Sequence, residues 1–369
     1  MSLVEVYQWC TSIREHFPNL GYWQALNLAI YSLGMVLARH SAPSRVAEKC
    51  GVMGKPDSMQ RRLERFLDNP EVCWWTCCRY WARWVISRYA GERLILLVDE
   101  TKLGQHLSVM VLGLAYRGGC IPLAFWCYRP DAWPDRQVNL IDELLCWVVE
   151  SIPDGVIPLV QADRGIGTSP EVVRSVCALG WQFLFRVQGT TKLRANGQER
   201  SLRHLVNAPG QHWTATGHVF KKGGWLPATV HIIWEVGYRD PWCLITNCPD
   251  TGDGWLYAQR YWQEAGFRDL KSDGWQWQTS RIWSPDHANR LMLVMALATA
   301  WTLTLGTFAF DDPDLKPYFT KGRAITYSLF RLGLRFVETL LDHTAPVAWP
   351  LRPFICLSDP LSFPISVGV

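Results

Sequence analysis

The feature that most constrains the fold is a change of hydrophobic period near Arg93. Residues 5–90 place apolar side chains three and four apart, the spacing of amphipathic helices. Residues 94–98 then form an unbroken apolar run that stops at Asp99. A run of this length is typical of a strand buried on both faces of a sheet. The chain therefore predicts an all-helical module over residues 1–90, followed by an α/β unit.

The segments after Asp99 predict the order strand, strand, strand, helix, strand, helix, strand. Apolar runs lie at 94–98, 107–116, 120–128, 156–160 and 181–187, and helical patterns lie at 138–149 and 170–176. Arg117, Gly118 and Gly119 have the composition of a tight hairpin turn. A hairpin followed by right-handed parallel crossovers is the order of the ribonuclease-H-like fold.

A second set of short β-like runs over about 190–250 predicts a β-rich insertion before a helix at 257–271. A long apolar helix then starts near Asp286. Its segment 291–310 has the length and lack of charge of a membrane span, but four threonines and Gly306 favour a buried core helix. We expect a catalytic unit over 91–310 that includes the insertion, a tail region at 311–369, and no membrane contact.

The composition favours a globular protein of the cytosol. The 369 residues are 49% hydrophobic and 19% charged, enough for one sizeable core and an accessory module. The 12 cysteines are scattered without a C-x-x-C pair, and no signal-peptide pattern is present. Neither a complete glycine-rich dinucleotide motif nor a phosphate-loop motif occurs. We expect reduced thiols and no nucleotide cofactor.

All the excess positive charge lies in the first quarter of the chain. Up to Val98 there are twelve Lys and Arg against eight Asp and Glu, whereas the remainder holds 25 of each. Residues 58–67 predict a basic amphipathic helix that carries Arg61, Arg62 and Arg65 on one face. Such a face is commonly only solvated surface. Its position in the net basic segment makes contact with DNA phosphates an equal alternative.

Two carboxylates follow predicted strands that lie side by side. Asp99 ends the first strand, and Asp163 comes after the strand that a right-handed crossover places beside it. An Asp after a strand is usually a cap or turn residue, so either one alone indicates little. A third acid from a helix would make the group more specific.

That helix is predicted at 257–271. It begins with Tyr257, and three polar residues follow at three, seven and fourteen positions further on: Arg260, Glu264 and Lys271. At 3.6 residues per turn the four form one stripe. The stripe is either an ordinary solvated face with ion pairs or a phosphate-binding edge. With Asp99 and Asp163, the third acid would complete an oxygen-ligand set suited to two Mg²⁺ or Mn²⁺ ions about 3.5–4 Å apart.

The stripe spells Y-x2-R-x3-E-x6-K, which resembles the signature of DDE transposases of the insertion-sequence-four group. The resemblance extends through V-D-E-T at Asp99, A-D-R-G at Asp163 and the β-rich insertion, and spans roughly residues 93–301. The N-terminal segment S-M-Q-R-R-L-E-R-F-L-D-N is similar to the DNA-binding region of that group. The resemblance implies a ribonuclease-H-like catalytic core behind a helical DNA-binding domain.

The resemblance also implies roles for individual side chains. It implies three catalytic residues: Asp99, Asp163 and Glu264. These residues would bind two Mg²⁺ ions, or two Mn²⁺ ions instead. It implies that the residues contacting DNA phosphates are Tyr257, Arg260, Lys271 and Arg164, with Arg61, Arg62 and Arg65 in the N-terminal module. In this group a Trp of the insertion can stack on a flipped base. The candidates are Trp213, Trp225, Trp234 and Trp242, of which we select Trp234, although core packing is the commoner role of a tryptophan.

The implied function is cut-and-paste transposition by an enzyme that binds the terminal inverted repeats of an insertion sequence. The implied partners are duplex DNA, as element ends and as target, and a second copy of the chain in a homodimer on DNA. The implied location is the prokaryotic cytoplasm, at the nucleoid. Two alternatives remain open: a domesticated, catalytically silent DNA-binding protein, and a metal-dependent structure-specific nuclease on the same fold.

Overall fold

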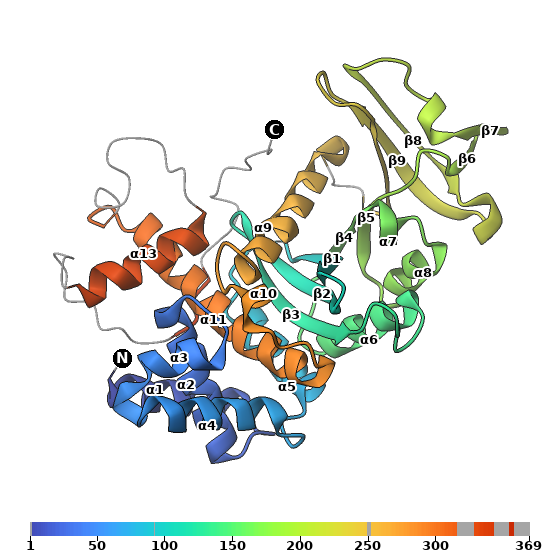
Figure 1. The fold of residues 1–369 in the computed structure, drawn as a ribbon. Coiled ribbons are helices and arrows are strands. Elements are labelled where there is room, and N and C mark those ends of the chain that lie inside the picture. The colour runs from blue at the N-terminus through green and yellow to red at the C-terminus, as the bar shows by residue number, and fades with distance from the viewer. Residues whose placement is uncertain (1, 92, 249–251, 316–327, 343–353, 358–369) are drawn as a thin grey trace.

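The computed structural model describes residues 2–91, 93–248, 252–315, 328–342 and 354–357. It is a mixed α/β protein in which N-terminal helices pack beside a ten-stranded sheet (Figure 1). The N-terminal helices are α1 (Leu3–His16), α2 (Tyr22–Ala38), α3 (Pro43–Lys49), the 3-10 turn η1 (Gly51–Met53), α4 (Pro56–Asp68) and α5 (Trp74–Ser87). The helical character predicted for residues 1–90 is confirmed.

The sheet has the strand order β3-β2-β1-β4-β5-β10-β9-β8-β6-β7. Its strands are β1 (Ile95–Leu103), β2 (Leu107–Tyr116), β3 (Gly119–Tyr128), β4 (Leu159–Ala162), β5 (Gln182–Arg186), β6 (Lys192–Ala195), β7 (Gln198–Ser201), β8 (Gln211–Val219), β9 (Leu226–Trp234) and β10 (Trp242–Thr246). The pairs β1–β4 and β4–β5 are parallel, and the other neighbouring pairs are antiparallel. The predicted hairpin and the two crossovers are confirmed. The β-rich insertion extends the same sheet, because β10 pairs with β5.

The later helices cover the sheet and complete the core. They are α6 (Gln137–Val149), α7 (Arg164–Gly167), α8 (Pro170–Ala178), η2 (Leu202–His204), η3 (Lys221–Gly223), η4 (Gly252–Arg260), α9 (Tyr261–Leu270), α10 (Trp277–Ser280), α11 (Pro285–Asp311) and α13 (Leu329–Leu341). Along β1, Leu97 packs in one apolar cluster with Tyr257 of η4, while Val98 joins the main core with α6. Since successive strand residues face opposite ways, β1 is covered on both faces.

We call β1 to β5 the inner half of the sheet, and β6 to β9 the outer arm. The inner half buries both faces: all ten residues of β2 and nine of the ten of β3 are buried. The outer arm projects beyond the helices (Figure 1), and β8 alternates between exposed and half-buried residues. The continuous apolar runs of the sequence thus mark strands covered on two sides.

Helix α11 is the central helix of the core. By length and composition it could cross a membrane, but 94% of its most apolar stretch is buried inside the protein. It contacts α2, α4, α5, α13 and β3. The predicted buried core helix is therefore confirmed. Asn289 on α11 also bonds the edge strand β3, because its side chain accepts from the Cys127 N–H (2.8 Å) and donates to the Cys127 carbonyl (3.4 Å).

The N-terminal helices are fixed to this central helix by polar contacts. Arg290 of α11 is buried and donates to the carbonyl oxygens of Leu67 (2.8 Å) and Val72 (3.2 Å), just where α4 ends. His287 lies 3.1 Å from the Asp68 carboxylate. A guanidinium group that satisfies terminal helix carbonyls holds α4 in a defined position on the core.

Part of the predicted tail region lies outside the described residues. Within it, α13 packs against α11 at a close helix crossing formed by Gly306 and Gly333. A Cβ atom on either glycine would collide with the backbone of the other helix. The sequence analysis found no motif in this region and did not predict α13.

Candidate active site

The two aspartates lie at adjacent strands, as predicted. Val98 of β1 is paired with Ala162 of β4, so the residues that follow, Asp99 and Asp163, are neighbours where this parallel pairing ends. The prediction that the first strand stops at Asp99 is wrong, because β1 continues to Leu103 in its antiparallel pairing with β2. Asp163 is also the N-cap of α7: its Oδ1 accepts from the N–H groups of Gly165 (2.9 Å) and Ile166 (3.1 Å). The capping interpretation is confirmed, and Oδ2 remains directed at Arg260.

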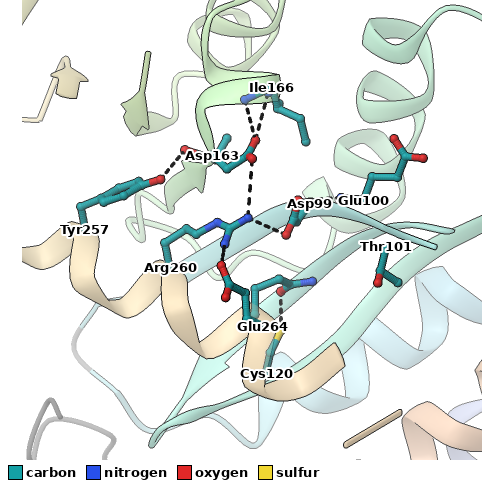
Figure 2. Close-up of polar contacts among 12 residues, drawn as sticks. Asp99, Glu100, Thr101, Cys120, Asp163, Ile166, Tyr257, Arg260 and Glu264 are labelled. Atoms are coloured by element: carbon teal, nitrogen blue, oxygen red, sulfur yellow. Dashed lines mark hydrogen bonds and ion pairs between the residues drawn. The ribbon is translucent and has the colours of Figure 1, made fainter. Parts of the chain in front are cut away.

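A single guanidinium group connects the three acids (Figure 2). Nη2 of Arg260 lies 2.6 Å from Asp99 Oδ2 and 3.9 Å from Asp163 Oδ2, and Nη1 lies 2.5 Å from Glu264 Oε1. The Arg260 side chain is 11% exposed and that of Asp99 13%, whereas Asp163 (40%) and Glu264 (52%) open to solvent. The predicted convergence of the three carboxylates is thus present, with Arg260 between them.

The electrostatics of this cluster follow from burial and from the density of acids. Burial raises the pKa of Asp99 to about 6; Arg260 opposes this rise, and Asp163 adds to it. Burial disfavours the charge on Arg260, but Asp99 and the other acidic neighbours raise the pKa of its guanidinium above the ordinary value. The acids and Arg260 stabilise each other's charged forms. Removing either of them would leave a buried charge without a neighbouring charge of opposite sign.

The helix that carries the stripe is not continuous. Tyr257 and Arg260 lie on the 3-10 helix η4, α9 begins only at Tyr261, and Lys271 has already left the helix as its C-cap. Within η4, Gly254 has φ of 92°, and the side chains of β9 and β10 leave no room there for a Cβ atom. The prediction of one helix over 257–271 is wrong at both ends.

The break changes where the ends of the stripe point. The Tyr257 hydroxyl donates to the Ala162 carbonyl (3.2 Å) and is buried. Lys271 Nζ donates to Thr101 Oγ1 (2.5 Å) on β1, two residues beyond Asp99 and on the same face. Both side chains therefore secure η4 and α9 over the ends of β1 and β4. The predicted contacts of the stripe with DNA phosphates remain predictions.

A cavity of about 330 Å³ opens beside the acids. Its polar lining includes Asp163, Glu264 and three arginines: Arg164, Arg186 and Arg260. Arg186 ends β5, on the strand next to β4, and sequence reasoning missed it. The signal was available, because the fifth predicted strand runs parallel to the two that carry the aspartates and ends at the same edge.

The donor atoms fit a divalent cation in type but not in their present spacing. All three acids offer hard oxygen ligands, which suit Mg²⁺ or Mn²⁺. Yet across the described residues no three His, Cys, Asp or Glu side chains are close enough to hold one metal ion. The guanidinium of Arg260 takes the central position.

The arginines predicted on the N-terminal helix do not share one face. Arg61 and Arg65 are exposed and line a surface groove with Ser58 and Glu64. Arg62 is half-buried and donates to the Asn27 side chain of α2 (2.5 Å). Successive helix residues are about 100° apart, so only positions four apart coincide. The prediction is corrected to Arg61 and Arg65.

The structure favours a different tryptophan beside the acids. Trp234 donates its indole N–H to the Tyr238 carbonyl (2.9 Å) and is absent from the lining of the site cavity. Trp242 lines that cavity, packs edge-on against Tyr257 (centroids 5.4 Å apart), and also lines a second cavity with Trp255. Place in the insertion does not distinguish the four candidate tryptophans, and their contacts could not be deduced from the sequence.

Comparison with known proteins identifies a family model that matches part of the chain. Residues 137–301 match the family model described as "Transposase DDE domain". No curated protein matches the chain. The matched segment runs from α6 into α11 and includes Asp163 and Glu264, while Asp99 lies before it. This domain indicates a DDE-type transposase, a metal-dependent enzyme that cleaves DNA during transposition and recombination.

Proposed function

We propose that this DDE-type transposase binds the terminal inverted repeats of an insertion sequence of the insertion-sequence-four type and moves it by cut-and-paste transposition. The observation that carries the proposal is the convergence of Asp99, Asp163 and Glu264 on one cationic group, where the parallel pairing of β1 with β4 ends. The strand order of the inner half supports a ribonuclease-H-like catalytic core over 91–310.

The three acids are the proposed metal ligands. Two Mg²⁺ ions, or Mn²⁺ in their place, would activate the attacking oxygen and stabilise the leaving oxygen of each phosphoryl transfer. Asp163 is already oriented, since α7 fixes its Oδ1 and leaves Oδ2 facing the site. Asp99 is fixed by its place within β1, and its side chain is largely buried. Glu264, the most exposed of the three, is free to adjust on α9.

Arg260 has two successive roles in this proposal. In the protein without DNA it neutralises the acids and keeps them together despite their mutual repulsion. A DNA phosphate offers the same guanidinium a bidentate partner. Transfer of Arg260 to the phosphate frees the carboxylates for the cations. Arg164 and Arg186, which line the same cavity, supply further positive charge to the backbone of the bound strand.

The aromatic wall of the cavity is the proposed place for a flipped base. Trp242 and Tyr238 line both the site cavity and the neighbouring one, where Trp255 stands partly exposed. Stacking on such rings compensates the cost of unstacking a base. We propose Trp242 in place of Trp234 for this role.

The N-terminal domain, residues 1–90, is the proposed reader of the element ends. Arg61 and Arg65 on α4 are exposed side chains suited to phosphate contact. Both ends of a mobile element must be held together, so we propose a homodimer assembled on DNA. The proposed location is the prokaryotic cytoplasm, at the nucleoid.

The proposal is tested with the purified enzyme, Mg²⁺, a duplex carrying the terminal repeat that flanks the gene, and a target plasmid. Wild type is expected to cut the repeat and join it to the plasmid, and Asp163→Asn to do neither while it still binds the repeat. Cutting without joining would support a structure-specific nuclease. Binding by wild type without cutting would support a silent DNA-binding protein.

A further inference from the structure

Two hydrogen bonds tie η4 to strand β4, and they run in opposite directions. The side-chain amide of Gln161 in β4 donates to the Leu256 carbonyl of η4 (3.0 Å). The next residue of η4, Tyr257, donates through its hydroxyl to the carbonyl of the next residue of β4, Ala162 (3.2 Å). Each element thus supplies one side-chain donor and one backbone acceptor. We call this pair of bonds the β4–η4 clamp.

The clamp lies next to Asp163 and Arg260 along the chain. Asp163 follows Ala162 directly, and Arg260 comes three residues after Tyr257. A 3-10 helix has three residues per turn, so side chains three apart leave it on the same side. Figure 2 shows Tyr257 and Arg260 both directed from η4 toward Asp163. A bond that fixes Tyr257 therefore also fixes the direction in which Arg260 leaves the helix.

The helix η4 depends on contacts with the sheet for its position. It has nine residues, whereas 3-10 helices seldom exceed three or four because their hydrogen bonds are poorly aligned. Beneath it, Tyr257 packs in one apolar cluster with Leu97 and Leu184. Apolar packing holds η4 against the sheet but is not directional. The two hydrogen bonds of the clamp are directional, and they set where η4 stands along β4.

Gln161 is a polar residue in an otherwise apolar layer. It is the only polar residue of β4 and is fully buried, and its partners in the two neighbouring strands are Leu97 and Leu184. Its Oε1 has no hydrogen-bond partner within the part of the chain that the structure describes. Burying an amide with one half unpaired costs free energy. Stability therefore does not explain a glutamine here, whereas the orientation of η4 does.

We propose that Gln161 is a positioning residue of the active site, which holds Arg260 between the acids by fixing η4 on β4. The inference rests on the proposed function, because it gives Arg260 the place of a cation. Gln161 does not line the site cavity, so it acts through Arg260 and not on DNA. The backbone of β1 and the cap of α7 place Asp99 and Asp163 without the clamp. Loss of the Gln161 bond should therefore loosen the guanidinium and leave these two acids in place.

The test compares two substitutions on the same face of the sheet. Gln161→Met removes the amide donor and keeps the length of the side chain. Thr246→Val is the matched control: Thr246 is fully buried, pairs with Leu184 on that face, and donates its hydroxyl to the Phe183 carbonyl (2.5 Å). Each change removes a buried bond from a side chain to the backbone, but only the first bond reaches η4. Full-length proteins are used, and Gln161→Met is expected to melt within about 3 °C of wild type, because the unpaired Oε1 is removed as well.

The first readout is Mn²⁺ binding to the DNA-free protein, titrated by electron paramagnetic resonance. Gln161→Met is expected to strengthen binding about threefold, because a guanidinium that is no longer held between the acids competes less with the cation. Thr246→Val is expected to bind Mn²⁺ as wild type does. Wild-type affinity in Gln161→Met, or the same change in both variants, would overturn the inference.

The second readout is a double-mutant cycle, which separates positioning from a general structural effect. If Gln161 acts through Arg260, adding Gln161→Met to Arg260→Gln should leave Mn²⁺ binding no tighter than in Arg260→Gln alone. A further gain of about threefold in the double variant would show that Gln161 affects the acids by another route, and would overturn the inference. These titrations contain no DNA. Failure of the wild type to cut and join DNA would overturn the proposed function and leave their outcome decisive for Gln161.

Discussion

The inner half and the outer arm belong to one sheet but differ in how much of each strand is covered. β2 has ten buried residues in sequence, whereas β8 has one buried residue in nine. In the inner half this cover places Asp99 where water is largely excluded and charges interact strongly. In the outer arm the acids are exposed and simply paired. The cover on a strand thus decides whether an acid on it is largely removed from water, as Asp99 is, or remains solvated, as Glu199 does.

The largest expected effect is on DNA cleavage, and it distinguishes an acid beside the inner half from an acid in the outer arm. Glu264→Gln, on α9 beside the inner half, should abolish metal-dependent cleavage, because it removes a proposed cation ligand from the site. Glu199→Gln in the outer arm removes the same charge from an exposed ion pair and should leave cleavage intact. Gel assays of cut product measure both. Residual cleavage by Glu264→Gln at the wild-type rate would remove this residue from the catalytic set.

The next effect is on stability. Leu97→Ala empties a fully buried position of β1 and should lower the free energy of unfolding by about 2–5 kcal/mol. Thr216→Ala, at an exposed position of β8, should change it by about 0.5 kcal/mol or less. Urea denaturation of both variants measures the difference. Similar changes in the two variants would show that the outer arm is as tightly packed as the inner half.

A smaller effect concerns the arginine between the acids. Arg260→Gln should strengthen Mn²⁺ binding to the DNA-free protein about tenfold, or about 1.4 kcal/mol, because the competing cation is gone and the acids repel one another. Arg194→Gln in the outer arm is the control and should have no effect. Titration followed by electron paramagnetic resonance measures free Mn²⁺. Weaker binding by Arg260→Gln would mean that Arg260 supports the metal site instead of blocking it.

The smallest effect is a dependence of stability on pH. Burial raises the pKa of Asp269 in α9 to about 8 from its ordinary 3.8; Asp273 adds to this rise, and Arg268 and Arg331 oppose it. Between about pH 4 and pH 8 the folded state keeps this proton and the unfolded state releases it. Wild-type stability therefore falls as pH rises through that window, by at most about 1.4 kcal/mol per unit.

Asp269→Asn removes this dependence, because its side chain stays neutral at every pH. Its melting temperature should exceed that of wild type by more at pH 7.5 than at pH 5. Glu199→Gln in the outer arm provides the comparison and should show no such trend. A constant difference across pH would mean that Asp269 ionises in the folded protein as it does in solution.

The sequence predicted what depends on local pattern and chain order. The position of Asp99 beside Asp163 followed from two apolar runs and the handedness of crossovers, and the buried state of α11 from its threonines. What could not be predicted depends on contacts between distant segments. The inward turn of Arg62 needs Asn27 of another helix, and Arg186 joins the site only through strand order.

The two ends of the sheet have a consequence for assembly. At one end the backbone of Cys127 is already bonded by Asn289, and at the other β7 has only four residues, with Glu199 and Arg200 exposed on it. Short, charged or capped edges do not recruit further strands. These features disfavour the fusion of two copies into one longer sheet. We expect any pairing of copies to use helices, loops or DNA.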